Sequence, residues 1–239
     1  MKRALKWVGI VVALLVVLAG MVWYFAFGNN KPIVEGNVVD GVQTVKDGFV
    51  NVFLVDAGPG KVALVDAGND KSGEALLAAL AARNLTASSV AAIFLTHGHG
   101  DHTAGCKLFP GADVYAMEAD VPLVGNAAKI AHPLHDGEVV TVGDLRVEAF
   151  SVPGHTPGSA AYLARGVLFF GDSAGASKTG TLMKAVRLFS KDSAQNVASL
   201  TALAGRLAPR QGEIKAMAFG HTGSLVGLDA LTAFAAEHP

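Results

Sequence analysis

The pattern of apolar and polar positions divides the chain into an uncharged N-terminal run and a longer region of short alternating segments. Residues 7–27 carry no charged side chain. A helix rises about 1.5 Å per residue, so a run of this length spans the roughly 30 Å hydrocarbon core of a bilayer. Lys2, Arg3 and Lys6 precede the run and keep the N-terminus cytoplasmic by the positive-inside tendency. The pattern therefore predicts a transmembrane signal-anchor that contacts lipid through residues 7–27, with the rest of the chain in the periplasm or outside the cell.

A cleaved signal peptide is the alternative interpretation of the same run. Residues 26–28 form a small-x-small sequence of the kind that signal peptidases cleave, and cleavage there would release a secreted or periplasmic protein. The length of the run and the three aromatic residues at 23–25 favour a retained anchor. Residues 1–30 are expected to form a basic tip, the anchor and a short linker, and residues 31–239 to form one domain.

Beyond residue 31, short β-rich runs alternate with helical stretches. Two successive sets of strands, each closed by helices, indicate two sheets packed face to face with helices outside. Periodicity alone leaves other α/β folds open. Strands are expected at 38–45, 49–56, 62–66, 91–96, 112–117, 139–142, 145–152, 160–163, 167–170 and 214–219, and helices at 72–84, 118–124, 194–207 and 228–237.

Composition narrows the classes of partner and site. The 19 basic and 20 acidic residues nearly balance, so no whole-protein field attracts nucleic acid. Cys106 is the single cysteine, which excludes an intrachain disulfide and a cysteine-rich zinc site.

A cluster of possible metal ligands follows the strand expected at 91–96. His97, His99, Asp101 and His102 lie within six residues and are separated by glycines, which we expect to let the backbone turn tightly. Neutral imidazole and carboxylate are the ligand types that suit zinc and similar divalent metals. The spacing therefore predicts a metal site at the end of this strand.

Three later residues occupy comparable positions. His155 lies in a Gly/Pro-rich turn after the strand expected at 145–152, Asp172 follows the strand at 167–170, and His221 follows the strand at 214–219. Each is a strand end followed by a turn of small residues, where a sheet can direct ligands toward a common centre.

Together these residues resemble the metallo-β-lactamase superfamily, whose HxHxDH signature is complete here, and the resemblance runs from about Val38 to the C-terminus. It implies an αββα sandwich of two mixed β-sheets flanked by helices. It also implies two divalent ions, with zinc expected and iron or manganese as alternatives. By this resemblance the first ion is held by His97, His99 and His155, the second by Asp101, His102 and His221, and Asp172 bridges the two.

The resemblance further implies a hydrolase in which a metal-bound hydroxide attacks the carbonyl of a small ester, thioester, lactone or lactam. Asp101 and Asp172 would then be catalytic. Asp66 resembles an aspartate at a strand end of the family and is expected to accept a hydrogen bond that orients a ligand imidazole or loop. Asp56 lies in the same local sequence, LVDAG, and is expected to be an exposed turn residue.

Residues 178–191 contain basic residues and no acidic one. Lys178, Lys184 and Arg187 are candidate substrate contacts, and the apolar residues between them recur at helical spacing. An ordinary amphipathic surface helix is one interpretation. A lid that attracts an anionic substrate, or rests on anionic lipid, is the other.

Several branches of the family share this ligand set. Thioesterases similar to glyoxalase II carry a C-terminal helical region that binds glutathione, whereas eighteen residues follow His221 here, which disfavours that substrate. Lactonases of the family use a late tyrosine, and no tyrosine follows Asp172. An exported enzyme acting on β-lactams and a non-catalytic metal-binding scaffold remain alternatives. The natural substrate and the oligomeric state are left open.

Overall fold

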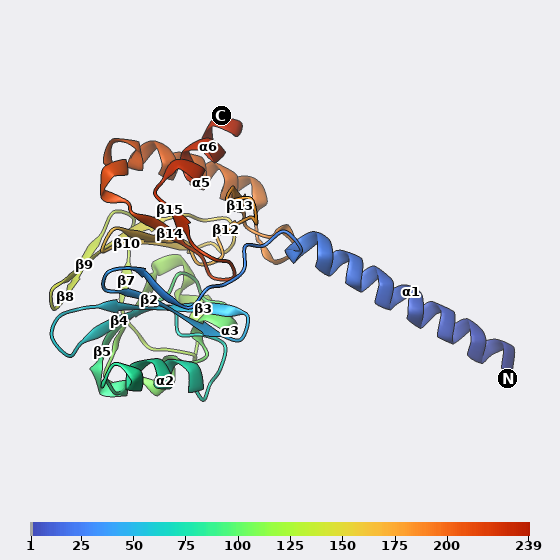
Figure 1. Ribbon diagram of the computed structural model, residues 1–239, viewed down its shortest axis with the longest axis horizontal. Helices are drawn as coiled ribbons and strands as arrows, with labels where there is room; N and C mark the ends of the chain where they lie inside the picture. The colour runs from blue at the N-terminus through green and yellow to red at the C-terminus, as the bar shows by residue number, and fades with distance from the viewer. Residues whose placement is uncertain (1) are drawn as a thin grey trace. The chain divides into compact units, whose positions relative to one another are not determined.

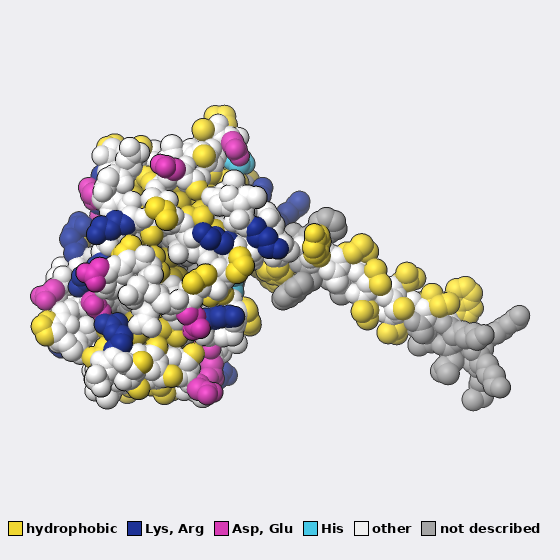
Figure 2. Space-filling view, viewed as in Figure 1, with side chains coloured by type: hydrophobic (Ala, Val, Ile, Leu, Met, Phe, Trp, Pro, Cys, Tyr) yellow, Lys and Arg dark blue, Asp and Glu magenta, His cyan; other side chains and the backbone are white. Residues whose placement is uncertain are grey.

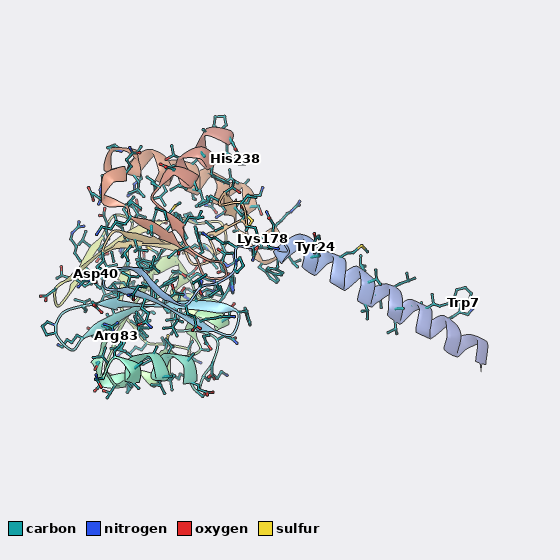
Figure 3. All side chains as sticks on the ribbon, viewed as in Figure 1. Trp7, Tyr24, Asp40, Arg83, Lys178 and His238 are labelled. Atoms are coloured by element: carbon teal, nitrogen blue, oxygen red, sulfur yellow. The ribbon has the colours of Figure 1, made fainter. Side chains whose placement is uncertain are left out.

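The computed structural model describes residues 2–239, apart from some side chains of the N-terminal helix, including those of the basic residues at 2, 3 and 6 and the aromatic residues at 23 and 25. Its internal contacts divide the chain into two units, Met1–Asn30 and Lys31–Pro239. The first unit contains the helix α1 (Lys2–Phe27), with Trp7 and Tyr24 labelled near its two ends in Figure 3.

Apolar side chains of α1 are exposed, among them Leu14 and Val16, and they form yellow bands along the helix in Figure 2. Among the described residues, however, no helix combines the length and apolarity that crossing a bilayer requires. The helix expected over residues 7–27 is present, but its assignment as a transmembrane span is not supported.

The second unit is built on two sheets. In the described residues the first sheet has the order β1-β2-β3-β4-β5-β6-β7, with antiparallel pairing from β1 to β4 and parallel pairing from β4 to β7. Its strands are β1 (Gly36–Val39), β2 (Val42–Asp47), β3 (Val50–Asp56), β4 (Val62–Val65), β5 (Val90–Phe94), β6 (Asp113–Met117) and β7 (Ile130–Leu134).

The second sheet has the order β15-β14-β11-β10-β9-β8 in the described residues, and only its β11–β14 pair is parallel. Both sheets are therefore mixed. The strands are β8 (Val139–Val142), β9 (Leu145–Ser151), β10 (Ala160–Ala164), β11 (Val167–Phe169), β14 (Ala216–Ala218) and β15 (Leu225–Val226); a separate hairpin pairs β12 (Ala174–Ala176) with β13 (Leu182–Lys184).

Helices cover the outer face of each sheet, as Figure 1 shows. The helix α2 (Glu74–Ala82) packs on the first sheet, and α5 (Ser193–Leu207) and α6 (Asp229–Glu237) pack on the second. The expected αββα sandwich is confirmed. Short helices occupy loops: α3 (Gly100–Thr103), α4 (Val121–Val124), and the 3-10 turns η1 (Ala87–Ser89), η2 (Cys106–Leu108), η3 (Glu118–Asp120), η4 (Arg187–Phe189) and η5 (Ala208–Glu213).

Aromatic residues from both sheets join in the central core. Phe53 of the first sheet packs on Phe169 of the second with ring centroids 5.1 Å apart, and Phe94 packs on Tyr162 at 5.5 Å. The buried Tyr162 hydroxyl donates a hydrogen bond to the carbonyl of Leu95 at 2.8 Å, so it carries no unsatisfied polar group into the core. Burying each such side chain contributes about 1.5–3 kcal/mol.

Some element boundaries differ from the expected ones. The strand expected at 38–45 is divided by a turn at Asp40 (labelled in Figure 3) and Gly41, whose φ of +75° favours glycine. The helix expected from residue 72 begins at Glu74, because the carboxylate of Asp70 binds the backbone N–H groups of Ser72 and Glu74. The strand β7 was not expected; it lies at a sheet edge, where its proline is tolerated.

Residues 178–191 do not form the amphipathic helix that their spacing suggests. The chain reverses at Gly180, whose φ is +85°, and β13 then pairs with β12. This pairing buries Leu182, and only the 3-10 turn η4 follows it. The helical spacing of apolar residues in this segment was therefore misleading.

Candidate metal centre

The first ligand loop leaves the end of β5. His99 stands at the N-cap position of α3, and Asp101 and His102 lie in the first turn of that helix. Neither Gly98 nor Gly100 has a positive φ, so the loop does not depend on glycine for a left-handed conformation. A Cβ on Gly98 would lie 2.8 Å from the backbone nitrogen of Val124, so glycine there permits close packing against α4.

The other ligand candidates come from the second sheet. His155 follows β9, Asp172 follows β11, and His221 follows β14. A Cβ on Gly220 would lie 2.4 Å from Asp172 Oδ1 and 2.8 Å from His102 Cε1. The glycine before His221 therefore lets the backbone approach the cluster.

The structure brings all seven candidates together. Asp172 Oδ1 lies 3.2 Å from His102 Nε2, and Asp172 Oδ2 lies 3.1 Å from His221 Nε2 and 3.7 Å from His155 Nε2. Asp172 thus contacts members of two ligand groups. Among the described residues, the groups whose ligand atoms all lie within 4.8 Å of one another are His97, His99 and His155; Asp101, His102 and His221; and His97, His102 and Asp172.

The protein holds four of the five histidines by the ring nitrogen that faces away from the centre. In each of these the Nδ1 atom lies near an oxygen of the protein, which leaves Nε2 for the centre. His99 is the exception, because its Nδ1 lies 3.0 Å from His155 Nε2. The pairs are His97 Nδ1 with Thr96 Oγ1 at 3.1 Å, His102 Nδ1 with Asp66 Oδ2 at 2.8 Å, His155 Nδ1 with Ser190 Oγ at 3.3 Å, and His221 Nδ1 with the Phe49 carbonyl at 2.9 Å.

Buried polar atoms at the centre fit metal ligation. His97 Nε2, His102 Nε2 and Asp172 Oδ1 are buried and make no well-aligned hydrogen bond among the described residues, although His102 Nε2 and Asp172 Oδ1 face each other as an ion pair at 3.2 Å. Leaving such atoms unpaired costs free energy, and a divalent ion would satisfy them together. Imidazole and carboxylate donors in two adjoining groups suit two ions, with zinc as the expected metal.

Two histidines of the first ligand group, His97 and His155, favour the neutral imidazole. Burial holds the pKa of His97 well below its ordinary value and lowers the pKa of His155 to about 4. Neutral imidazole is the form that binds metals, so these side chains need to release no proton before ligation.

The second ligand group holds protons in the metal-free chain. Burial acts to lower the pKa of His102, but Asp172 and Asp66 outweigh it and raise that pKa well above its ordinary value. Burial is likewise outweighed at His221, where hydrogen bonds to Asp101 and Asp172 raise the pKa to about 10. Metal binding to this group must therefore release protons.

Asp66 directly follows β4 and adopts a left-handed conformation, with φ +61°. Its carboxylate accepts hydrogen bonds from the backbone N–H and hydroxyl of Thr96 as well as from His102. The expectation that Asp56 is an exposed turn residue is wrong: it is the last residue of β3, pairs in register with Val62, and is half-buried because its carboxylate binds Arg83, which is labelled in Figure 3. The two copies of LVDAG thus place their aspartates in a buried network and in a surface ion pair.

Several supporting residues were not identified from the sequence. Ser190 contacts His155, and the ring of Phe49 stacks on His221 with centroids 5.6 Å apart. The backbone of Lys31 donates to Ala176 and accepts from Gly223, so it joins the hairpin after Asp172 to the loop after His221. These contacts join residues far apart in sequence, and no local pattern signals them.

The basic candidates Lys178, Lys184 and Arg187 are all exposed. Lys178 lies between β12 and β13 (Figure 3), and Lys184 pairs in register with Ala174. Their segment begins after strand β12, in the hairpin that follows Asp172, and ends at Lys191, whose backbone N–H donates to the His155 carbonyl at 3.0 Å. It is therefore tied to the metal centre at both ends.

Comparison with known proteins identifies the family of this chain. Residues 45–221 match the sequence family described as the metallo-beta-lactamase superfamily. The chain belongs to this superfamily.

Among its relatives is a hydroxyacylglutathione hydrolase of Xanthomonas euvesicatoria, 32% identical over 153 residues, covering 62% of this chain and 56% of the relative. Another, from a Synechococcus species, is 32% identical over 174 residues, covering 68% and 64%. The chain thus spans less than two thirds of their length. A metallo-beta-lactamase family protein of Thermus thermophilus has a similar structure, with 25% identity, a TM-score of 0.61, and coverage of 84% and 80%. Both sequence relatives are thus named as hydrolases, and the structural relative as a member of the metallo-beta-lactamase family.

Proposed function

We propose that residues 31–239 form a dinuclear-metal hydrolase that cleaves the acyl bond of a small thioester. The observation that carries the proposal is Asp172, whose two carboxylate oxygens reach ligand candidates of both groups. The names of the curated relatives support a thioester as the substrate class. Esters, lactones and lactams contain the same kind of reacting carbonyl and form the comparison set.

Two divalent ions bound at this centre would supply Lewis-acid activation of water and of the substrate carbonyl. The chain's own residues orient the substrate and exclude water. The side chains of Asp101 and His221 are 27% and 24% exposed, whereas those of His102 and His155 are almost wholly buried. Substrate therefore approaches the centre from the side of Asp101 and His221. The buried imidazoles of His102 and His155 lie where solvent does not reach.

The basic segment favours an anionic group on the substrate. Between Asp172 and Asp192 the chain carries lysines and an arginine but no acidic residue. Lys184 and Arg187 are exposed there, on a segment attached to two ligand loops. Replacing both by glutamine should raise KM for an anionic thioester while leaving kcat nearly unchanged, because attraction at a distance assists binding more than chemistry.

The direct test is a substrate panel with the zinc-loaded full chain. Glutathione thioesters, neutral thioesters, esters, lactones and β-lactams are compared by kcat/KM. Faster hydrolysis of thioesters than of the other classes, lost in Asp172→Ala, would support the proposal. Preference for a β-lactam or a lactone would replace the substrate class. A chain that binds zinc but hydrolyses nothing in the panel would favour the non-catalytic scaffold.

We also propose that the domain acts outside the cytoplasm. The support is sequence order alone, with basic residues before an uncharged run at residues 7–27. N-terminal sequencing of protein from native cells separates a retained segment from cleavage near residue 28, and detergent-dependent release reports contact of residues 7–27 with lipid. Resistance of the domain to protease added to spheroplasts, despite cleavage after lysis, would refute export.

A further inference from the structure

A buried carboxylate joins the two loops that carry the first ligand group. Asp120, the last residue of η3, is fully buried. Its Oδ2 accepts hydrogen bonds from the backbone N–H of Gly98 and from the hydroxyl of Thr156, both at 2.8 Å. Its Oδ1 accepts from the backbone N–H of Gly158 at 2.7 Å. Gly98 lies between two ligand histidines, and Thr156 follows a third.

Close packing reinforces these hydrogen bonds. A Cβ on Gly158 would lie 2.3 Å from the backbone nitrogen of Asp120 and 2.7 Å from its Cβ. A Cβ on Gly98 would lie 2.9 Å from the Cβ of Leu123, three residues after Asp120. Both ligand loops therefore press against the segment from η3 to α4 at separations that only glycine allows. The carboxylate lies where the loops meet.

The three hydrogen-bond donors to Asp120 are two backbone N–H groups and one hydroxyl, all of them neutral. Burying a carboxylate costs free energy that neutral donors offset only if they converge on it with good geometry. The buried carboxylate of Asp120 therefore restricts the positions of the groups that donate to it. Two of these groups, the backbone N–H of Gly98 and of Gly158, belong to the ligand loops.

We propose that Asp120 is a positioning residue, which sets the separation of the His97–His99 loop from the His155 loop and so controls the affinity of the first metal ion. This rests on the proposed two-metal function. The second group has separate supports, since Asp66 holds His102 and the Phe49 carbonyl holds His221. Loss of Asp120 should therefore affect one ion selectively.

The experiment is zinc titration of the full chain and of Asp120→Asn against a chelator of known affinity. Asparagine keeps the size but replaces one acceptor oxygen with a donor. The affinity for one of the two ions should fall about 10- to 100-fold, the usual effect of removing a support of a metal ligand, and the other should change less than about threefold. Visible spectra of the cobalt-substituted protein report the same loss without an activity assay.

Asp47→Asn is the matched control. Asp47 is also buried and accepts backbone N–H groups, from Asn69 at 2.6 Å and Asp70 at 2.8 Å, but it contacts neither of these ligand loops. It should lower the thermal midpoint without altering either zinc affinity. The proposal would be overturned if Asp120→Asn lowered both zinc affinities equally or changed neither. It would also be overturned if Asp47→Asn lowered one zinc affinity as Asp120→Asn is expected to do.

Thr156 keeps the proposal testable if Asp120→Asn does not fold. Thr156→Val removes one of the three hydrogen bonds and should weaken the same single ion, whereas Thr156→Ser keeps the hydroxyl and should restore its affinity. Equal affinities in the two variants would contradict the inference. If the unsubstituted chain binds fewer than two zinc ions, the proposed two-metal function itself is refuted. If the Asp120 variant binds two zinc ions with unaltered affinity, only the positioning role of Asp120 is refuted.

Discussion

Asp66 holds His102 through a buried hydrogen bond of 2.8 Å, and removing its charge should weaken the second ligand group. Asp66→Asn is the informative change, because asparagine tolerates the left-handed backbone at φ +61° nearly as well as aspartate. Alanine would add backbone strain to the loss of hydrogen bonds. The substitution therefore isolates the chemistry of the carboxylate.

The expected magnitude follows from the donors that converge on Asp66. The backbone N–H and the hydroxyl of Thr96 and the Nδ1–H of His102 all point at the carboxylate. Asparagine offers one acceptor oxygen and turns an NH₂ group toward the rest, so at least one charged hydrogen bond is lost. Such a bond contributes about 1.5–3 kcal/mol to the free energy of unfolding. A metal site whose affinity falls 10- to 100-fold loses about 1.4–2.7 kcal/mol of binding free energy. The loss expected in metal binding is therefore of the same size as the loss expected in stability.

The assay is urea unfolding of the metal-free chain together with zinc titration. Asp56→Asn is the control, since Asp56 has the same neighbours in sequence but is 35% exposed and paired with Arg83 on the surface. Its loss should cost at most about 1 kcal/mol and leave zinc binding unchanged. Equal zinc affinities in the two variants would show that the Asp66–His102 contact does not support the metal centre.

Three further outcomes follow from the structure. Asp172→Ala should abolish nearly all hydrolysis while the far-ultraviolet circular dichroism stays unchanged; retention of a tenth of the rate would argue against a shared ligand. Cys106 borders a cavity of about 590 Å³, but burial raises the pKa of its thiol to about 12, so thiol reagents should modify it only on unfolding. Hydrogen bonds from Arg210 lower the pKa of Glu148, so that pair stabilises the fold above the ordinary pKa of glutamate and loses its effect as pH falls through the lowered value. Arg210→Gln should therefore cost about 1 kcal/mol in urea unfolding at pH 7, and this cost should shrink as the pH is lowered through the depressed pKa of Glu148.

The clustering of the ligand candidates could be predicted because each candidate lies in a local pattern. His155, Asp172 and His221 directly follow apolar strands, and strand ends of a sheet lie near one another. The ligand loop after β5 needed no knowledge of the rest of the chain, since its spacing alone signals a metal site.

The supporting residues could not be predicted for the opposite reason. Asp120 contacts Gly98 and Thr156 through hydrogen bonds that exist only once both sheets are packed. The helix predicted for the basic segment was wrong. Leu182 and Val186 recur at helical spacing, but the chain turns at Gly180 and forms the β12–β13 hairpin instead. Propensity in a short segment yields to such pairing.

The ligand candidates are divided between the two sheets. His97 and His102 follow β5 of the first sheet, whereas His155, Asp172 and His221 follow strands of the second. An ion held by residues from both sheets acts as a cross-link between the halves of the sandwich, as a disulfide does in chains with more than one cysteine. Its stabilisation grows with ligand concentration, reaching about 4 kcal/mol when free metal exceeds the dissociation constant a thousandfold. Under the proposed function, the supply of free metal in its compartment therefore adds to the free energy with which the core already holds the two sheets together.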